Sequence, residues 1–422
     1  MTAHPTRILT EGETSLLDAF ANAKLEGDAR QAALAAIEQN GLPTRRVEAF
    51  HYTDLRALLK GGYAPVARPE DDVAKSAGAA FPRLVSDAAV LHFRDGHYFD
   101  QGEAVPAGVT LAVNEIEPAK VDSAIANAVE QINTAFLQDS VSLTVAESAE
   151  VTRIVGLAHA QTGTPGTLSA NRTSIAAGAG STSHFANRAC GKDDVAYLSS
   201  DIVDITIAEG ATVNFTLSIE EGNLAQRLAR LNVRVAKDGV LNLFILNASE
   251  GMVRQEINFD MEGEGGALNI AGINMVGGKS HIDITSRITH HAPNTTAEET
   301  FRNVATGSGR GVFQGQINVA QIAQLTDARM ACNTLLLSDN CDFSAKPELE
   351  IFADDVQCAH GATVTELEES YLFYLRARGI SEVTARRMLI NAFVAELLEM
   401  IENEDMAINL QGLIDGWMER HV

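Results

Sequence analysis

Hydrophobic and polar residues follow three different patterns along the chain, and the first pattern predicts helices. The segments SLLDAFANAK and ARQAALAAIEQN carry apolar residues at helical spacing and are rich in alanine and leucine. Gly41 and Pro43 follow the second segment, and residues of these types commonly end helices. We therefore predict a helical or mixed N-terminal region over residues 1–140.

Two further elements are predicted inside this region. VLHFRDGHYF has apolar runs on both sides of Asp95 and Gly96, a pair that favours a hairpin turn. VDSAIANAVEQINTAFLQ predicts another helix.

The second pattern, over residues 141–364, is a series of short strands separated by Gly, Asn and Asp. Strand, turn and strand recur in DIVDITIAEGATVNFTL around Gly210, RLNVRVAKDGVLNLFIL around Gly239 and INFDMEGEGGALNIAGI around Gly266, at intervals of 29 and 27 residues. Similar units continue in SHIDITSRITHH and GVFQGQINVAQ. A repeat of this length that contains only strands predicts the stacked coils of a β-solenoid, and hence a mainly β fold.

Alternation inside one repeat supports this interpretation. Apolar residues on one side of each strand are Ile205 and Ile207 before the turn, and Val213, Phe215 and Leu217 after it. Because one coil cannot bury its apolar side alone, neighbouring coils would stack and share a core. An antiparallel sandwich is the competing interpretation, although it would show less regular spacing.

The third pattern, over residues 365–422, is again helical. TELEESYLFYLRARG forms one segment that ends at Gly379, and Ser381 is a suitable N-cap for SEVTARRMLINAFVAELLEMI. The apolar stripe of this second helix consists of Leu389, Phe393, Leu397 and Ile401. A last short helix reaches Trp417. These helices would either pack on the end of the solenoid or present a face to another protein.

Charge and cysteine content exclude several functional classes. The formal net charge of −24 argues against binding to nucleic acid or to an anionic membrane, because both require clustered Lys and Arg. The four cysteines are scattered without a CxxC, which is typical of a reducing compartment. The N-terminal segment has no apolar signal-peptide core, and no apolar run approaches the roughly 20 residues that span a bilayer. We therefore expect a cytoplasmic protein.

Cys358 and His360 are the strongest candidates for chemistry, because two residues of spacing on a strand place both on one face. Thiolate and imidazole are preferred ligands of zinc, copper and iron. Val356 shares that face, so the alternative is a core cysteine and a hydrogen-bonded histidine at a strand end. Two ligands cannot close a tetrahedral site. A metal bound here would need further ligands, for instance from another chain at the exposed solenoid edge.

Other candidate sites have simpler explanations. His281, His290 and His291 have no nearby Glu or Cys at a known ligand spacing, so we expect structural or turn roles for them. The chain contains no GxxxxGK[ST], no GxGxxG at a strand-to-helix junction and no GxSxG. A solenoid that cleaves polysaccharide would use acidic residues in a groove, and a stand-alone enzyme of this kind is the alternative function.

Two stretches resemble a known family. AKPELEIFADDVQCAHGATVTELEESYLFYLRARGIS, residues 345–381, resembles the signature of the SufB/SufD family of iron–sulfur cluster assembly proteins, and more closely its SufD branch. GLPTRRVEAFHYTDL near the N-terminus is similar to a second SufD segment, although Phe50 and His51 stand where the family usually has Trp and a basic residue. The central repeats resemble the family in pattern only.

The resemblance implies a right-handed parallel β-helix flanked by helical N- and C-terminal regions, in a scaffold subunit rather than an enzyme. Such a subunit would pair with SufB through the edge of the β-helix and dock the SufC ATPase through its C-terminal helices. Packing or docking surface there would come from Tyr371, Phe373, Tyr374 and Leu375. The same edge would permit a homodimer in the absence of SufB.

The resemblance also implies where the chemistry takes place. A transient iron–sulfur cluster, shared with SufB, would be built at the interface, and no cofactor would be bound permanently. The family places an iron or cluster ligand at His360, and Cys358 matches the neighbouring thiol. SufB would carry the main acceptor cysteine.

Overall fold

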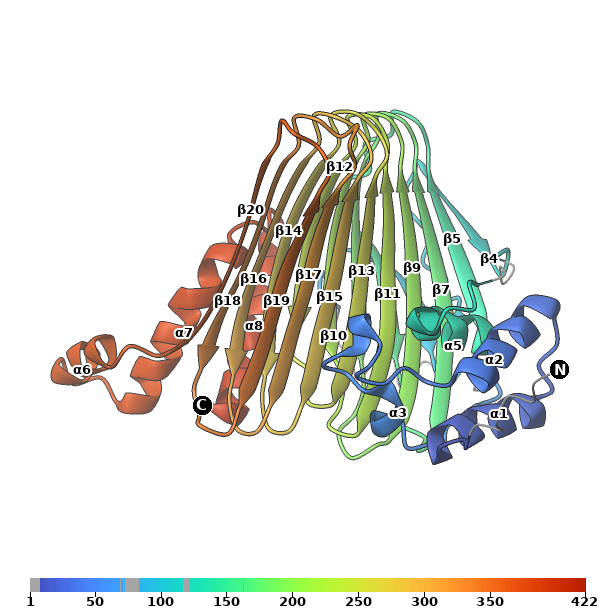
Figure 1. Ribbon diagram of the computed structural model, residues 1–422, viewed down its shortest axis with the longest axis horizontal. Coiled ribbons are helices and arrows are strands. Elements are labelled where there is room, and N and C mark those ends of the chain that lie inside the picture. Colours follow the sequence, from blue (N-terminus) through green and yellow to red (C-terminus); the bar gives the residue numbers. More distant parts are fainter. Residues whose placement is uncertain (1–7, 69, 71, 73–82, 117–120, 162) are drawn as a thin grey trace.

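The structure is a computed structural model that describes residues 8–68, 70, 72, 83–116, 121–161 and 163–422. Its centre is a parallel β-solenoid of about eight coils, and helices flank this solenoid at both ends of the described chain (Figure 1). The predicted mainly β fold with a parallel solenoid core is therefore confirmed, and the antiparallel sandwich is wrong.

Each coil gives one strand to each of two sheets. The described strands of sheet A, in spatial order, are β19 (Asp342–Ile351), β17 (Arg310–Val319), β15 (His281–His290), β13 (Met252–Met261), β11 (Ala225–Val235), β9 (Tyr197–Ile207), β7 (Thr167–Ala177), β5 (Asp139–Val145) and β4 (Val109–Val113), with β1 (Ala64–Pro65) beside β7. Those of sheet B are β20 (Gln357–Glu366), β18 (Asp327–Leu336), β16 (Thr296–Ala305), β14 (Ala267–Val276), β12 (Val240–Asn247), β10 (Thr212–Glu220), β8 (Thr182–Cys190), β6 (Val155–Ala160), β2 (Ala89–Arg94) and β3 (His97–Phe99).

Parallel pairing in register stacks equivalent residues of successive coils into columns. Thr212 of β10 lies beside Val240 of β12, which lies beside Ala267 of β14. Inward-facing positions such as Ile205 and Phe215 are buried in one core that runs through the coils. The predicted strand–turn–strand repeats therefore correspond to single coils, with the turns between β9 and β10, β11 and β12, and β13 and β14.

The two ends of the solenoid differ. At the N-terminal end each sheet finishes with a short antiparallel strand, β4 beside β5 and β3 beside β2. At the other end, β19 and β20 each pair on one side only among the strands that the structure describes. Val364 on β20 is 43% exposed and Ile351 on β19 is 38% exposed, because no further coil covers them. We call this the open end.

The N-terminal helices cover part of the outer face of sheet A (Figure 1). They are α1 (Glu11–Ala23), α2 (Asp28–Asn40), α3 (Leu55–Leu58) and α5 (Ala128–Phe136), with 3-10 turns η1 (Glu48–Phe50) and η2 (Ile125–Asn127). Phe20 and Phe136 meet edge to face and share an apolar cluster with Leu198 and Leu228 of the sheet. The predicted helices and the β2–β3 hairpin are confirmed, and Asp95 and Gly96 have the positive φ angles of such a turn.

The C-terminal helices are α6 (Glu369–Ala377), α7 (Glu382–Leu398) and α8 (Glu404–His421). Helices α7 and α8 pack on the outer face of sheet B, where Ile390 and Trp417 share a buried cluster with Ile273 and Val304. They therefore lie along the flank of the solenoid and not on its end. No described helix is both long and apolar enough to cross a membrane.

Two details of this region differ from the prediction. The buried residues of α7 are Ala385, Ile390, Val394, Leu397 and Leu398. Leu389 and Phe393 are only half-buried, because the helix is turned so that the ring of Phe393 lies 5.1 Å from the guanidinium of Arg302 at the rim of the contact. The last helix, α8, is not short but has 18 residues.

Helix α6 projects away from the terminal coil (Figure 1). It begins at Glu369, because Thr365 and Glu366 still pair with β18 as part of β20. Phe373 is 75% exposed, and Tyr371 and Tyr374 are more than half exposed. This helix thus carries largely exposed aromatic side chains, of which Tyr374 has the guanidinium of Arg378 4.6 Å from its ring centre.

Candidate metal centre at the open end of the solenoid

Cys358 and His360 both lie on β20, the last strand of sheet B. Cys358 pairs in register with Ala328, and His360 pairs with Met330. Ala328 and Met330 are buried in the solenoid core. Because stacked residues of a parallel sheet share one face, Cys358 and His360 occupy the inward positions of the terminal coil.

Cys358 is half-buried and packs against the core. Burial raises the pKa of its thiol, the negative charge of Asp327 adds to this effect, and the backbone N–H of Ala328 opposes it. The thiol is therefore neutral near pH 7 and would have to lose its proton to bind a metal.

His360 is exposed although it occupies a position that is apolar and buried one coil earlier. The reason is topological, since the solenoid ends here and no following strand covers β20. The imidazole is therefore accessible to a molecule that contacts the open end.

The terminal coil does not complete a metal site by itself. Among the residues that the structure describes, no three His, Cys, Asp or Glu side chains are placed to hold a metal ion. Cys358 and His360 would supply two ligands, and a four-coordinate centre would need the others from outside the described chain.

A buried carboxylate lies two coils behind His360. Glu299 of β16 pairs with Met330, which in turn pairs with His360, so these three residues form one inward column. The side chain of Glu299 is completely buried, and burial raises its pKa to about 7. The sequence analysis missed this residue, although the inward alternation of Ala297, Glu299 and Phe301 in TAEETFRNVA was a usable signal.

The three histidines of β15 and the following turn do not form a cluster. His281 begins the strand and contacts the hydroxyl of Thr53 at 2.8 Å, whereas His290 ends the strand and contacts Thr295. A ring nitrogen of His291 lies 3.1 Å from a carboxylate oxygen of Asp260. His281 and His290 are the first and last residues of the ten-residue strand β15, so they lie roughly 30 Å apart. These separate contacts agree with the predicted structural and turn roles.

The N-terminal stretch GLPTRRVEAFHYTDL, residues 41–55, crosses the outer face of sheet A, and we call it the strap. Phe50 is fully buried with the guanidinium of Arg254 3.9 Å from its ring centre. Thr53 donates a hydrogen bond to Asp283, and Glu48 pairs with Lys346 of β19. The strap therefore ties the N-terminal helices to the coils nearest the open end.

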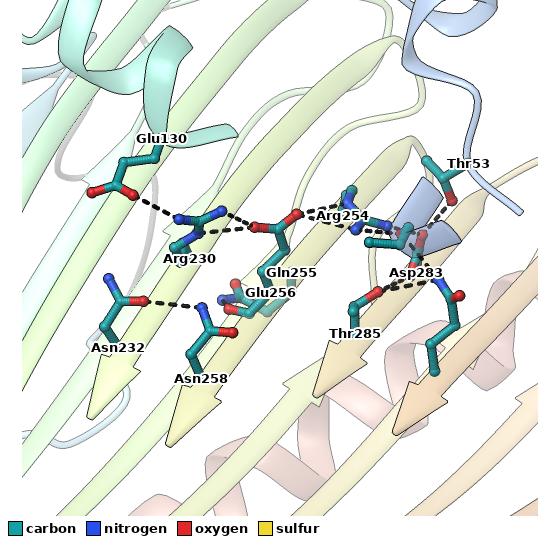
Figure 2. A network of polar contacts seen from close by, with 12 residues as sticks. Thr53, Glu130, Arg230, Asn232, Arg254, Gln255, Glu256, Asn258, Asp283 and Thr285 are labelled. Atoms are coloured by element: carbon teal, nitrogen blue, oxygen red, sulfur yellow. Dashed lines mark hydrogen bonds and ion pairs between the residues drawn. The ribbon is translucent and has the colours of Figure 1, made fainter. Parts of the chain in front are cut away.

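A chain of alternating charges holds the strap and α5 on the sheet (Figure 2). Arg230 donates to Glu130 of α5 at 2.7 Å and to Glu256 at 2.9 Å, and Arg254 donates to Glu256 at 3.1 Å. Arg254 also pairs with the buried Asp283. The sequence analysis missed this network, because outward charges on strands usually indicate a solvated face.

A polar groove of about 590 Å³ lies beside this network. A glycan-cleaving site would need a carboxylic acid whose raised pKa keeps it protonated. Burial alone would raise the pKa of Glu256 in the groove, but Arg230 and Arg254 together lower it. Glu299 is the one described carboxyl group with a clearly raised pKa, and it is sealed inside the solenoid. Glu256 is therefore unsuited to act as the protonated acid of such a site.

Comparison with known proteins points to one family. Residues 159–393 match the family described as SUF system FeS cluster assembly, SufBD core domain. The iron-sulfur cluster assembly protein SufD of Escherichia coli is 28% identical over 386 residues, and the match spans 88% of each chain. An iron-sulfur cluster assembly SufBD family protein of Synechocystis is 29% identical over 205 residues, which cover 49% of this chain and 45% of the relative. The chloroplastic protein ABCI7 of Arabidopsis thaliana is 28% identical over 228 residues, 54% of this chain and 48% of the relative.

Proposed function

Because the chain belongs to the SufBD family of SUF-system iron–sulfur cluster assembly proteins, we propose that it is a scaffold subunit on which a transient cluster is built. The cluster is cargo and not a permanent cofactor. The observation that carries the proposal is the position of Cys358 and His360 at inward sites of a coil that no described strand covers. A reducing cytoplasm would keep the free thiol of Cys358 available.

A SufB-type subunit is the partner that would complete the site. The outer edge of β20 presents unpaired backbone N–H and C=O groups, which can pair with a strand of another chain. Two ligands from this chain and further ligands from the partner would then surround the iron. His360 would bind through a neutral ring nitrogen, and Cys358 would bind as a thiolate after releasing its proton.

A SufC-type ATPase is the second proposed partner, and it would dock on the C-terminal helices. The exposed aromatic residues of α6 provide an apolar surface of the kind that partner proteins bury. Helices α7 and α8 are packed on sheet B, so a force applied to this region would reach the solenoid. Nucleotide-driven dimerisation of the ATPase would then strain the interface at the open end.

The test is to express the full chain with a SufB-type and a SufC-type protein and to measure iron and sulfide in the purified assembly. His360→Ala should leave the assembly intact and remove most of the iron and sulfide. His291→Ala is the matched control, since this exposed histidine contacts Asp260 in the turn before β16, two coils behind the terminal one, and it should retain the metal. Wild-type iron and sulfide in the His360 variant would show that the ligand role is wrong.

A further inference from the structure

Turns from sheet A to sheet B repeat one backbone feature in successive coils. In each of seven such turns, one residue has a positive φ angle and its N–H donates to a carbonyl group of the next coil. These residues are Ser148, Gly180, Gly210, Asp238, Gly265, Asn294 and Leu325. They form a column along one edge of the solenoid. Five of the seven are Gly, Asn or Asp, the types that most readily adopt this left-handed conformation, and Ser148 is a small polar residue.

Leu325 is the exception. Its φ angle is +61°, and its N–H donates to the carbonyl oxygen of Asp355 at 2.6 Å in the last coil. Among the described non-glycine residues with positive φ, it is the only apolar one. A branched apolar side chain is disfavoured in this conformation, and such strain tends to persist where a side chain has a function.

The side chain of Leu325 is not used inside the protein. It is 54% exposed, and Ile322 in the same turn is 71% exposed. In the next coil, Phe352 is 65% exposed and Ile351 is 38% exposed. None of the earlier described turns from sheet A to sheet B has a large exposed apolar residue. We call these four residues the turn patch.

We propose that the turn patch is an apolar anchor for the β-helix subunit that abuts the open end, an inference that rests on the proposed function. The patch is continuous with that end, because Ile351 is the last residue of β19 and Phe352 follows it directly. A subunit that covers the free edges of β19 and β20 reaches the patch without crossing any other element. Most of the binding energy of such a contact comes from a few side chains that are fully desolvated near its centre, and the turn patch would have to be buried in this way.

The substitution Leu325→Asn separates this role from a structural one, because asparagine occupies the equivalent position, Asn294, one coil earlier. The variant should unfold at a higher urea concentration than the wild type, since the backbone strain is relieved. The same variant should bind a purified SufB-type subunit at least tenfold more weakly. A residue with only a structural role would not give these opposite changes.

Leu224→Asn is the matched control. Leu224 is 51% exposed in the turn between β10 and β11, on the opposite edge of the solenoid, and its variant should bind the SufB-type subunit as the wild type does. If the wild type binds and Leu325→Asn binds equally well, the turn patch is not an anchor, although the proposed function stands. If Leu325→Asn weakens only self-association of the chain, the proposed occupant is wrong. If the wild type does not bind a SufB-type subunit at all, the proposed function itself fails.

Discussion

Replacing Glu299 with glutamine should stabilise the protein at neutral pH and have little effect at acid pH. The side chain of Glu299 lies on an inward position of β16, is fully buried and has no ion-pair partner among the described residues. Burial raises its pKa from 4.5 to about 7, and the hydroxyl of Ser286 opposes only part of this shift. The folded protein therefore holds this proton more tightly than the unfolded chain does.

The magnitude follows from linkage between protonation and folding. Between pH 4.5 and about pH 7 the unfolded chain has released the proton and the folded protein has not, so the free energy of unfolding falls as pH rises. One pKa unit corresponds to about 1.4 kcal/mol, so the full cost of burying this carboxyl group is about 3 kcal/mol above pH 7. Glutamine does not ionise and avoids this cost. The gain in stability should therefore grow by about 2 kcal/mol between pH 5 and pH 8.

Urea unfolding of the isolated chain at pH 5, 6, 7 and 8 would measure this gain, with Glu298→Gln as the control. Glu298 is the preceding residue on the same strand, but its side chain is exposed, so its variant should show no such trend with pH. A difference between Glu299→Gln and the wild type that stays constant from pH 5 to pH 8 would refute the raised pKa.

Two further predictions concern the strap and helix α6. Arg254→Met should lower the free energy of unfolding by about 3–5 kcal/mol, because it leaves the buried charge of Asp283 without its arginine partner. Urea unfolding would measure this loss, and the control Arg329→Met, at an exposed arginine, should stay within about 0.5 kcal/mol of the wild type. A loss below about 1 kcal/mol for Arg254→Met would contradict the reasoning. Phe373→Ser on α6 should abolish capture of a SufC-type ATPase in a pull-down while binding to a SufB-type subunit continues. Ile408→Ser is its control, because Ile408 is an apolar residue of α8 that is 63% exposed. Unchanged ATPase capture by the Phe373 variant would remove α6 from the proposed docking site.

The repeat around Gly210, Gly239 and Gly266 was enough to predict the solenoid, because each coil is a local unit with its own turn and alternation. Helix orientation was harder to predict. The stripe through Leu389 is a regular helical pattern, but the burial of α7 is decided by the flank of sheet B, which the pattern does not describe.

At the candidate site, too, features set by neighbouring residues could be predicted from the sequence, whereas contacts between distant segments could not. The spacing of Cys358 and His360 indicates a shared strand face, and the register of β20 against β18 agrees with it. Contacts between segments far apart in sequence were not predictable. Phe50 meets Arg254 across about two hundred residues, and no local pattern in either segment identifies the other.

The two ends of the solenoid have different edge strands, and this difference limits how many subunits can join by strand pairing. The strands β3 and β4 are short and antiparallel, so they blunt the first edge of each sheet against further pairing. Among the described strands, β19 and β20 are then the ones left free for pairing with another chain. When two such subunits pair through β19 and β20, neither subunit keeps a free strand at that end for a third. The product is therefore a closed pair and not a filament.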